Sequence, residues 1–387
     1  MCIRDSHYST AEGVAMARES YYHWLDWPKH IGAPDENGMA RYVNTGCLVI
    51  KEHENDYCKP VMAHLDNLGV AYKELGPEEL GEFFPYIDTR SFGPPVLAED
   101  PRFGQPTGEA VTGAIYIPES GYINDPQLAC HNQQRGCEAR GGEFLFNAEV
   151  VDILTEDGRT AGIKLADGTE VLAPVVVNAS GPHSFKINRM AGVEEGMQIK
   201  TRALKREVCH VPSPAGLDFN SLGTMFSDGD TGSYARPEVG NNVLVGSLDP
   251  KCDRQEWVDP DDYDQSFSGQ WKTQVMRKAQ RIPSLPIPQQ QQGIVDLYDV
   301  SDDWLPIYDA SDLPGFYMAV GTSGSQFKNA PVVGKLMAEL ITKVEAGQDH
   351  DNDPVQFYFK YTRHTCNIGF FSRLRELNQE SSYSVLG

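Results

Sequence analysis

The chain has 387 residues, 40% of them hydrophobic, which is enough to bury a large core divided between two domains. Its 33 basic and 55 acidic residues give a net charge of −22, which repels phosphate backbones and argues against nucleic acid as a partner. Apolar runs such as residues 175–177 are far too short to cross a bilayer, and no apolar stretch after Met1 suggests a signal peptide. We therefore expect a cytoplasmic protein without a membrane span. The eight cysteines lack zinc-type spacing, so we predict no metal.

The first third of the chain alternates helices and short strands. Apolar spacing predicts a helix over residues 10–31, and a strand is expected at 46–50. A second helix over 56–68 and a strand at 114–117 follow. Asp125 and Pro126 then open a further helix that runs to Arg140, because aspartate caps a helix start and proline fits its first turn.

Residues 144–173 have the pattern of a three-stranded meander. Strands are predicted at 144–154, 160–165 and 171–173, and the turns between them contain Gly158 and Gly168. An entirely apolar strand, 175–177, follows and ends in small residues over 178–181. Such an ending is typical of a buried parallel strand at the edge of a ligand crevice.

The second half of the chain contains a further strand, glycine turn and helix. Strands dominate 199–245, a helix is predicted over 261–281, and a strand at 316–320 enters the glycine turn 321–324. Pro331 then begins an amphipathic helix. Glycine lets a cofactor approach the backbone, and the helix start beyond supplies free N–H groups. Taken alone, either small-residue turn is explained equally well as an ordinary strand-to-helix turn of an α/β protein.

Together with the meander, the two turns resemble the FAD-dependent D-amino-acid oxidase/sarcosine oxidase (DAO) superfamily over most of the chain. Residues 120–126 look like the entry to the helix that precedes the family's adenine-contacting strand, and 149–153 look like that strand. Residues 177–184 are similar to its second flavin motif. The segment 321–328, with Pro331 and Gly334 after it, is similar to its C-terminal flavin motif.

The resemblance implies roles for individual residues. Lys328 would face a substrate carboxylate, Tyr234 would lie on the substrate side of the flavin, and Lys328 and Tyr234 would be the catalytic residues. Arg236 would join them in substrate binding, although an ordinary strand residue is an equally good interpretation of Tyr234 and Arg236. Some relatives attach the flavin to a cysteine where this chain has Asp296, so we expect non-covalent FAD. The residues expected to bind FAD are Val150, Ala179, Ser180, Gly181, Gly321, Ser323, Gly324, Gln326, Phe327 and Lys328.

One family element is not found in the sequence. The family begins with a strand, a GxGxxG turn and a helix, whereas the match here starts near His7, beyond that unit. We expect a truncated chain that binds FAD poorly and is inactive as given.

The expected fold class is α/β + β, with a glutathione-reductase-like FAD-binding domain that lacks its N-terminal βαβ unit and a substrate domain built on an antiparallel sheet. We predict the FAD-binding domain at 121–185 and 293–346, the substrate domain at 32–120 and 186–292, and an irregular C-terminal extension at 347–387. The resemblance implies oxidation of an amine or amino acid to an imine, with O2 or another electron acceptor. Dehydrogenation of a hydroxy acid or of glycerol 3-phosphate, and a non-catalytic flavoprotein fragment, are the alternatives.

Overall fold

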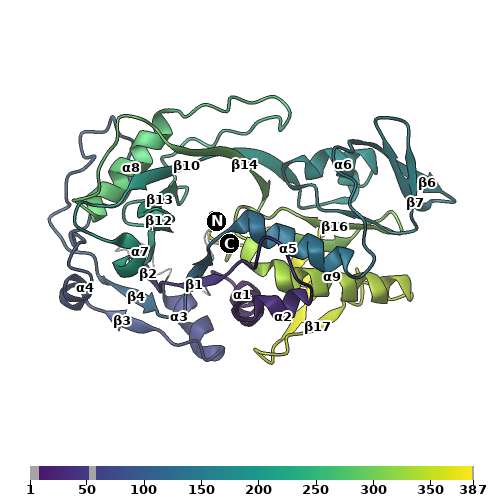
Figure 1. The fold of residues 1–387 in the computed structure, drawn as a ribbon, viewed down its shortest axis with the longest axis horizontal. Coiled ribbons are helices and arrows are strands. Elements are labelled where there is room, and N and C mark those ends of the chain that lie inside the picture. The colour runs from purple at the N-terminus through teal and green to yellow at the C-terminus, as the bar shows by residue number, and fades with distance from the viewer. Residues whose placement is uncertain (1–7, 52–57, 386–387) are drawn as a thin grey trace.

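An eight-stranded mixed sheet forms one half of the molecule, on the left of Figure 1, in the computed structural model, which describes residues 8–51 and 58–385. The strand order is β14-β10-β13-β12-β11-β2-β4-β3. Neighbouring strands are antiparallel except β11 and β2, which run parallel. The predicted antiparallel sheet therefore exists and contains one parallel pair. The strands of this sheet are β2 (Cys47–Lys51), β3 (Lys73–Leu75), β4 (Gly113–Ile117), β10 (Thr201–Pro212), β11 (Met225–Asp228), β12 (Ser233–Glu238), β13 (Asn242–Ser247) and β14 (Gly293–Ser301).

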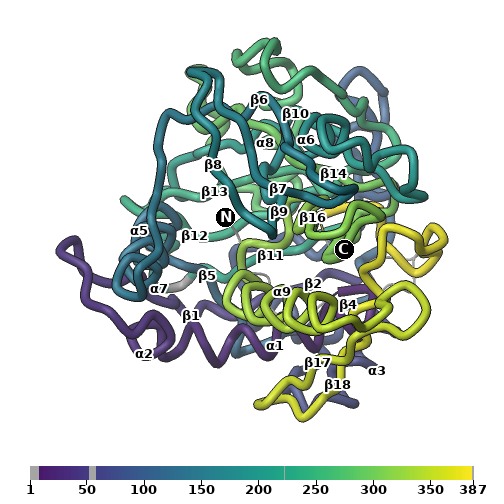
Figure 2. Tube along the Cα trace, turned by 90° about the vertical axis from the view of Figure 1, so that its right-hand side faces the viewer, coloured from purple at the N-terminus to yellow at the C-terminus, as the bar shows by residue number. Residues whose placement is uncertain are grey.

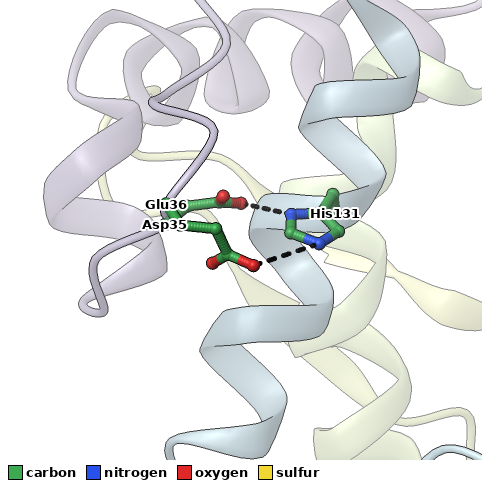
Figure 3. A group of neighbouring side chains, drawn as sticks. All are labelled: Asp35, Glu36 and His131. Atoms are coloured by element: carbon green, nitrogen blue, oxygen red, sulfur yellow. Dashed lines mark hydrogen bonds and ion pairs between the residues drawn. The ribbon is translucent and has the colours of Figure 1, made fainter.

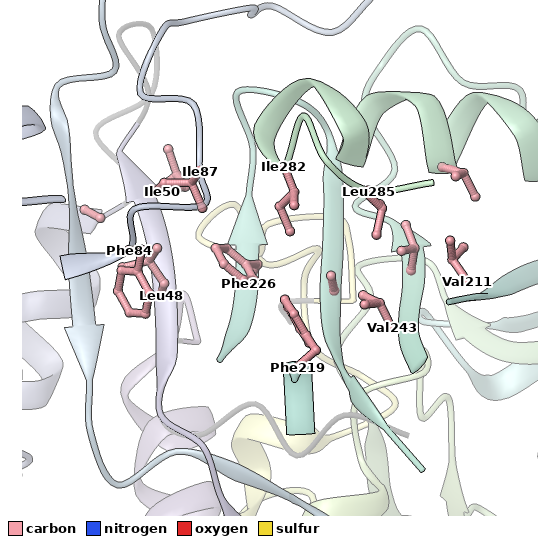
Figure 4. Close-up of a cluster of buried hydrophobic side chains, with 14 of the residues drawn as sticks. Leu48, Ile50, Phe84, Ile87, Val211, Phe219, Phe226, Val243, Ile282 and Leu285 are labelled. Atoms are coloured by element: carbon pink, nitrogen blue, oxygen red, sulfur yellow. The ribbon is translucent and has the colours of Figure 1, made fainter. Parts of the chain in front are cut away.

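The two faces of this sheet pack against different partners, because side chains alternate along each strand. One face buries an apolar core with the helices α4 (Pro77–Phe83), α7 (Phe219–Leu222) and α8 (Gly269–Arg281). Figure 4 shows this core, in which Phe226 and Leu48 lie on adjacent strands. The opposite face carries Tyr234, Leu204 and the other members of a second cluster. That second face is turned towards the other half of the molecule.

The other half contains small sheets covered by helices. The order β15-β16-β9 defines one three-stranded sheet, and β6-β7-β8 is the predicted meander. The long strands β10 and β14 run across the top of Figure 1 and link the two halves. The strands are β6 (Val150–Glu156), β7 (Arg159–Leu165), β8 (Glu170–Leu172), β9 (Val176–Asn178), β15 (Ile307–Ala310) and β16 (Phe316–Val320), with the pair β1 (Tyr42–Asn44) and β5 (Gly121–Ile123) beside them. The remaining helices are α1 (Ala11–Leu25), α2 (Trp27–Ile31), α3 (Cys58–Asn67), α5 (Pro126–Glu138), α6 (Ser184–Met190) and α9 (Ala330–Glu345).

Several local predictions are confirmed, and others are wrong. The helix predicted over 261–281 is α8, which begins only at Gly269, so residues 261–268 are not helical. The side chain of Asp125 accepts a hydrogen bond from the backbone N–H of Leu128, as expected of a helix cap. The helix predicted over 10–31 is divided at Asp26 into α1 and α2. Residues 144–149 are not a strand: β6 begins only at Val150, and Phe146 is 68% exposed. The expected start of the family match near His7, and residues 56–57 of the second predicted helix, lie outside the described residues.

The C-terminal segment is more ordered than predicted. Residues 347–385 contain the hairpin of β17 (Gln356–Tyr358) and β18 (Thr365–Asn367), followed by the short 3₁₀ helix η4 (Ile368–Phe371). Figure 2 shows this hairpin beside α1 and α9. Arg373 forms ion pairs with Asp309 at 3.1 Å and with Asp351 at 2.8 Å. The segment is thus anchored to β15 through a buried carboxylate.

The division into two domains stays a prediction. Strand β14, predicted in the FAD-binding domain, pairs with β10 along its whole length in the eight-stranded sheet. In the described part of the chain, no helix is long and apolar enough to cross a membrane.

Candidate functional site

The two predicted cofactor turns begin at the same edge of one sheet. Strands β9 and β16 are parallel, with Met318 opposite Asn178. Because the carboxyl ends of parallel strands meet at one edge, the turn after Asn178 and the turn after Val320 open on the same side. The structure therefore brings together the two flavin motifs that the sequence separates by about 140 residues.

Asn178 shapes the first of these turns. Its side-chain amide donates to the carbonyl of Ser184 at 2.9 Å and to Oδ1 of Asn188 at 2.8 Å, and its own Oδ1 accepts from the N–H of Ser180 at 3.1 Å. Ala179 and Ser180 are exposed. Gly181 has φ +56°, and no atom lies within 4 Å of the position of a Cβ added there. The hydrogen bonds of Asn178 therefore hold the turn in place, while Ala179, Ser180 and Gly181 remain accessible.

Asp299, on β14, connects the two turns. Its carboxylate accepts from Ser184 Oγ at 2.8 Å and from the N–H of Gly321 at 2.6 Å. Its backbone carbonyl accepts from the N–H of Ser323 at 2.7 Å. Ser184 also shares a hydrogen bond of 2.9 Å with Thr201 on β10. The eight-stranded sheet thus determines the relative position of both turns.

This carboxylate is deeply buried. Asp299 is 2% exposed, and burial raises its pKa to about 6, although its hydrogen bonds to Gly321 and Ser184 act in the opposite direction. Part of the population therefore carries a proton on Asp299 in mildly acidic solution. The connection between the two turns depends on the protonation of this one group.

The second turn requires unusual backbone conformations. Gly321 and Gly324 have φ of +69° and +73°, and Ser323 has φ +47°. A Cβ at Gly324 would lie 2.3 Å from the ring of Tyr298. Only glycine fits there, because both the backbone conformation and the tyrosine exclude a larger residue.

Gln326 and Phe327 lie in the structured end of this turn. Gln326 is buried, and its Oε1 accepts from the Tyr308 hydroxyl at 3.1 Å and from Asn329 Nδ2 at 2.7 Å. Phe327 is half-buried and stacks on Trp24 with ring centroids 5.7 Å apart. Helix α9 begins at Ala330 with Pro331 in its first turn, so its N-terminus points back to the same turn.

Lys328 is almost completely buried at 3% exposure. Its ammonium lies over the ring of Tyr8, 4.2 Å from the centroid, and its carbonyl accepts from the indole N–H of Trp24 at 2.7 Å. Tyr8 itself donates to the carbonyl of Ser325 at 3.1 Å. The lysine is therefore held inside the protein, next to the second turn.

Tyr234 and Arg236 lie on β12, on the face of the large sheet that is turned towards the other half. Tyr234 is 6% exposed and belongs to the cluster that also contains Trp304. Arg236 pairs with Glu238 at 2.7 Å, and its guanidinium lies 4.9 Å from the centroid of the Tyr122 ring. Arg236 Nε has no hydrogen-bond partner within the described chain. A buried donor without a partner is the kind of group that a ligand oxygen satisfies.

Val150 lies apart from these residues. It begins β6 opposite Leu165, in the meander sheet. It packs on the apolar cluster that contains Met318, and Val176 packs on the same cluster. The structure thus places Val150 beside β9 and β16 and assigns it no polar contact with the turns.

A separate polar cluster joins the loop after α2 to helix α5. Figure 3 shows His131 between Asp35, at 2.7 Å, and Glu36, at 3.9 Å. Asp35 also accepts from Asn132 at 2.6 Å, and Arg135 pairs with Glu36 through Nε at 3.0 Å. Because both carboxylates are already bound by side chains of α5, we interpret this cluster as a structural connection between loop and helix.

Asp299, Ser184 and Tyr298 were not predicted as site residues from the sequence. Ser184 falls inside segment 177–184, which carries the resemblance, but nothing local distinguishes it or Tyr298. The strand gives no clear signal for Asp299, because it also contains the exposed Asp296 and ends in Ser301. The importance of Asp299 depends on contacts that are distant in sequence.

The residues present fit the flavin end of FAD. Gly181 and the exposed Ala179 and Ser180 leave room for a group to approach the backbone, and the N-terminus of α9 favours a negatively charged ring edge. Gln326, Phe327 and Lys328 line the connection between that turn and the helix.

Comparison with known proteins gives a family. The model of the DAO family, FAD-dependent oxidoreductase, matches residues 2–340. The chain is 25% identical to glycine oxidase of Geobacillus kaustophilus over 73% of this chain and 70% of that one. It is 24% identical to sarcosine oxidase subunit beta of Rhodobacter capsulatus over 80% of this chain and 67% of that one.

The fold agrees with these relatives. The structure of L-proline dehydrogenase from P. horikoshii aligns with a TM-score of 0.71 at 19% identity, covering 95% of this chain and 84% of that one. At this identity the likeness establishes the fold alone. It confirms the expected α/β FAD-binding fold.

Proposed function

Because the chain belongs to the DAO family of FAD-dependent oxidoreductases, we propose that it oxidises an amine or amino acid at the carbon next to nitrogen, giving an imine. The printed names of two relatives, glycine oxidase and sarcosine oxidase subunit beta, support an amine substrate. The observation that carries the proposal is the meeting of two small-residue turns at one sheet edge, joined through Asp299 and followed by the start of α9. When bound, FAD supplies the hydride-accepting chemistry.

The protein's own residues bind and orient the substrate. We assign to Lys328 the pairing with a substrate carboxylate, since a buried ammonium beside the turn gives a strong charge-assisted contact. Arg236 offers a second donor through Nε, and Tyr234 a polar contact near the reacting nitrogen. The apolar cluster around Tyr234, with Leu204 and Trp304, excludes water from that side.

A panel of substrates tests the proposal. The protein with the family's N-terminal GxGxxG unit restored is loaded with FAD and mixed without oxygen with sarcosine, dimethylglycine, proline, a hydroxy acid or glycerol 3-phosphate. The visible absorbance of the flavin is then followed. We expect bleaching by a secondary or N-methylated amino acid. Its rate should rise with pH through the substrate's apparent pKa, because hydride departure needs the neutral nitrogen. Bleaching by the hydroxy acid or glycerol 3-phosphate alone would refute amine oxidation and leave the family assignment intact.

A further inference from the structure

A row of stacked rings leads away from the second turn. Phe327 stacks on Trp24 at 5.7 Å, Trp24 on Trp27 at 4.1 Å, and Trp27 on His30 at 5.3 Å, with interplanar angles of 21°, 22° and 18°. Trp24 and Trp27 are 2% and 1% exposed. Four rings from three segments of the chain therefore form one near-parallel column.

Hydrogen bonds hold the two tryptophans in place. The indole N–H of Trp24 donates to the carbonyl of Lys328 at 2.7 Å, and that of Trp27 donates to Asn132 Oδ1 at 2.9 Å. These two bonds fix the orientation of both indole rings, in addition to their apolar packing. The column is fixed at its inner end to the flavin turn itself.

The column continues to the surface. The ring of His30 lies 4.8 Å from that of His23, which contacts Tyr361 at 5.4 Å, and Tyr361 stacks on Tyr22 at 4.8 Å. Tyr361 is 45% exposed, in the turn between β17 and β18. The path ends where α1, α9 and the C-terminal hairpin come together, as Figure 2 shows.

Lysines gather at the surface end, on a chain with a net charge of −22. Lys335 Nζ lies 3.2 Å from His23 Nε2. Burial and the charge of Lys335 lower the pKa of His23 and His30 to about 4, and Arg140 contributes at His30, so both imidazoles are uncharged near neutral pH and the positive charge comes from the lysines. Burial and the charge of Lys360 lower the pKa of Lys335, whereas the Glu19 carboxylate raises it. We call His23, His30, Lys335, Lys360 and Tyr361 the basic patch.

Glu19 and Asp26 are acidic residues close in sequence to the patch. Glu19 is 4% exposed, and its carboxylate accepts from the backbone N–H groups of Tyr361 and Thr362 at 2.9 Å. Asp26 is exposed and lies 4.0 Å from Lys29. Lys335 and Lys360 therefore offer positive charge to an anion, on a chain whose net charge repels anions.

We propose that the ring column carries electrons from the flavin to an acidic one-electron carrier protein that docks on the basic patch. The inference rests on the proposed function, because the electrons come from the amine. The electron acceptor is then a separate protein, and O2 is not the acceptor. Closely packed aromatic rings shorten the through-space gaps that an electron must cross, and the patch supplies charge complementarity with an acidic partner.

The electrons balance over one turnover. Oxidation of the CH–NH group to the C=N group releases two electrons and two protons. Two carrier molecules, docking in succession, take one electron each. The two protons pass to water, and the cofactor returns to its oxidised state.

Ferricyanide, a one-electron anionic oxidant, is the probe. The FAD-loaded protein is reduced with stoichiometric dithionite without oxygen and mixed with ferricyanide at rising ionic strength. We expect reoxidation to slow as salt is added, although the net charge alone predicts the opposite. Lys335→Glu should lower the low-salt rate roughly three- to tenfold and abolish this salt dependence. The control Lys343→Glu, further along α9, should change neither.

The column is tested with Trp24→Phe and Trp27→Phe, which keep an aromatic ring while removing the indole. We expect slower reoxidation at every ionic strength, with FAD content and thermal unfolding close to wild type. Trp271→Phe is the control, because Trp271 is also a buried tryptophan with a bonded indole N–H but lies in the core between α8 and the large sheet. Rates that are indifferent to Trp24 and Trp27, or reoxidation by dissolved oxygen that outpaces ferricyanide in all variants, would overturn the proposal.

A second readout needs no flavin. Hexacyanocobaltate(III) has the same charge as ferricyanide and is redox-inert. Added to the FAD-free protein, it should shift the imidazole NMR signals of His23 and His30, and Lys335→Glu should abolish the shift. Unmoved imidazole signals would refute the docking site. Because dithionite supplies the electrons in the first experiment, failure of the amine panel would refute the proposed function without touching either result.

Discussion

The backbone N–H of Gly321 donates a 2.6 Å hydrogen bond to Oδ2 of the buried Asp299. This contact fixes the turn after β16 to a strand of the other half of the molecule. Through Ser184, the same carboxylate also fixes the turn after β9. One titrating group therefore determines how the two predicted flavin motifs face each other.

Replacing Asp299 with asparagine should change the pH dependence of stability. An unfolded aspartate titrates near pH 3.9, whereas Asp299 keeps its proton to about pH 6. The folded state thus binds more protons between these values, so the wild-type free energy of unfolding should fall as pH rises from about 4 to 6, by at most about 3 kcal/mol. Asp299→Asn lacks this term.

Urea denaturation of both proteins at several pH values measures the effect. The wild-type minus variant difference should decrease with pH in this window. Asp296→Asn, on the same strand and exposed, is the control and should give a nearly constant difference. A constant difference for Asp299→Asn as well would contradict the assignment.

Lys328→Met should weaken carboxylate substrates while FAD stays bound. Loss of a charge-assisted hydrogen bond in a dry site costs about 1.5–3 kcal/mol, or roughly 10- to 150-fold in kcat/KM. Anaerobic flavin reduction by the best amine of the panel measures it. The exposed Lys343→Met, near the end of α9, should leave the rate unchanged, and an unchanged rate for Lys328→Met would return Lys328 to a purely structural role.

Gly324→Ala should destabilise the protein in two ways. The alanine must adopt φ +73°, at about 1 kcal/mol, and its Cβ must displace the ring of Tyr298, at about 1–3 kcal/mol more. Gly347→Ala is the matched control, because Gly347 has φ +98° with nothing within 4 Å and so incurs only the first cost. Thermal unfolding compares the two variants. In a Tyr298→Ala background, Gly324→Ala should incur only the first cost, about 1 kcal/mol, and additive losses would argue against the clash.

Arg281→Met should destabilise the large sheet by about 3–5 kcal/mol. The side chain of Arg281 is fully buried and bridges Asp228 at 2.9 Å and Asp230 at 2.8 Å, so its removal takes the counter-charge from Asp230 and leaves Asp228 with Lys278 alone, at 3.8 Å. Urea denaturation measures the loss. Arg102→Met, which breaks the exposed pair with Asp100, should produce no measurable change. If both variants lost the same free energy of unfolding, burial would not determine how much an ion pair contributes to stability.

The sequence was most informative where the determinants are local. Asp125 was predicted to cap a helix and does so. The N–H that its side chain binds belongs to Leu128, only three residues later, so the contact is local. The apolar residues Phe144 and Phe146 were misread as part of a strand, since apolar character alone does not reveal which face is covered. They stack on each other at the surface instead.

The candidate site was predictable only in part. Glycine turns after apolar strands are visible in sequence, and the structure brings them to one edge. Asp299 could not be found in this way, because its partners Ser184 and Gly321 are 115 and 22 residues away. The depth of burial of Lys328 and the aromatic column from Trp24 likewise depend on which segments pack together.

The ion pairs of the C-terminal segment have a consequence for synthesis on the ribosome. Asp303 and Asp309 are fully buried, and their counter-charges come from Arg375 and Arg373, more than 60 residues later. While the nascent chain lacks those arginines, burying either carboxylate is strongly unfavourable. The region around β15 therefore completes its packing only after both arginines have left the exit tunnel, and until then its apolar surface is a natural binding site for chaperones.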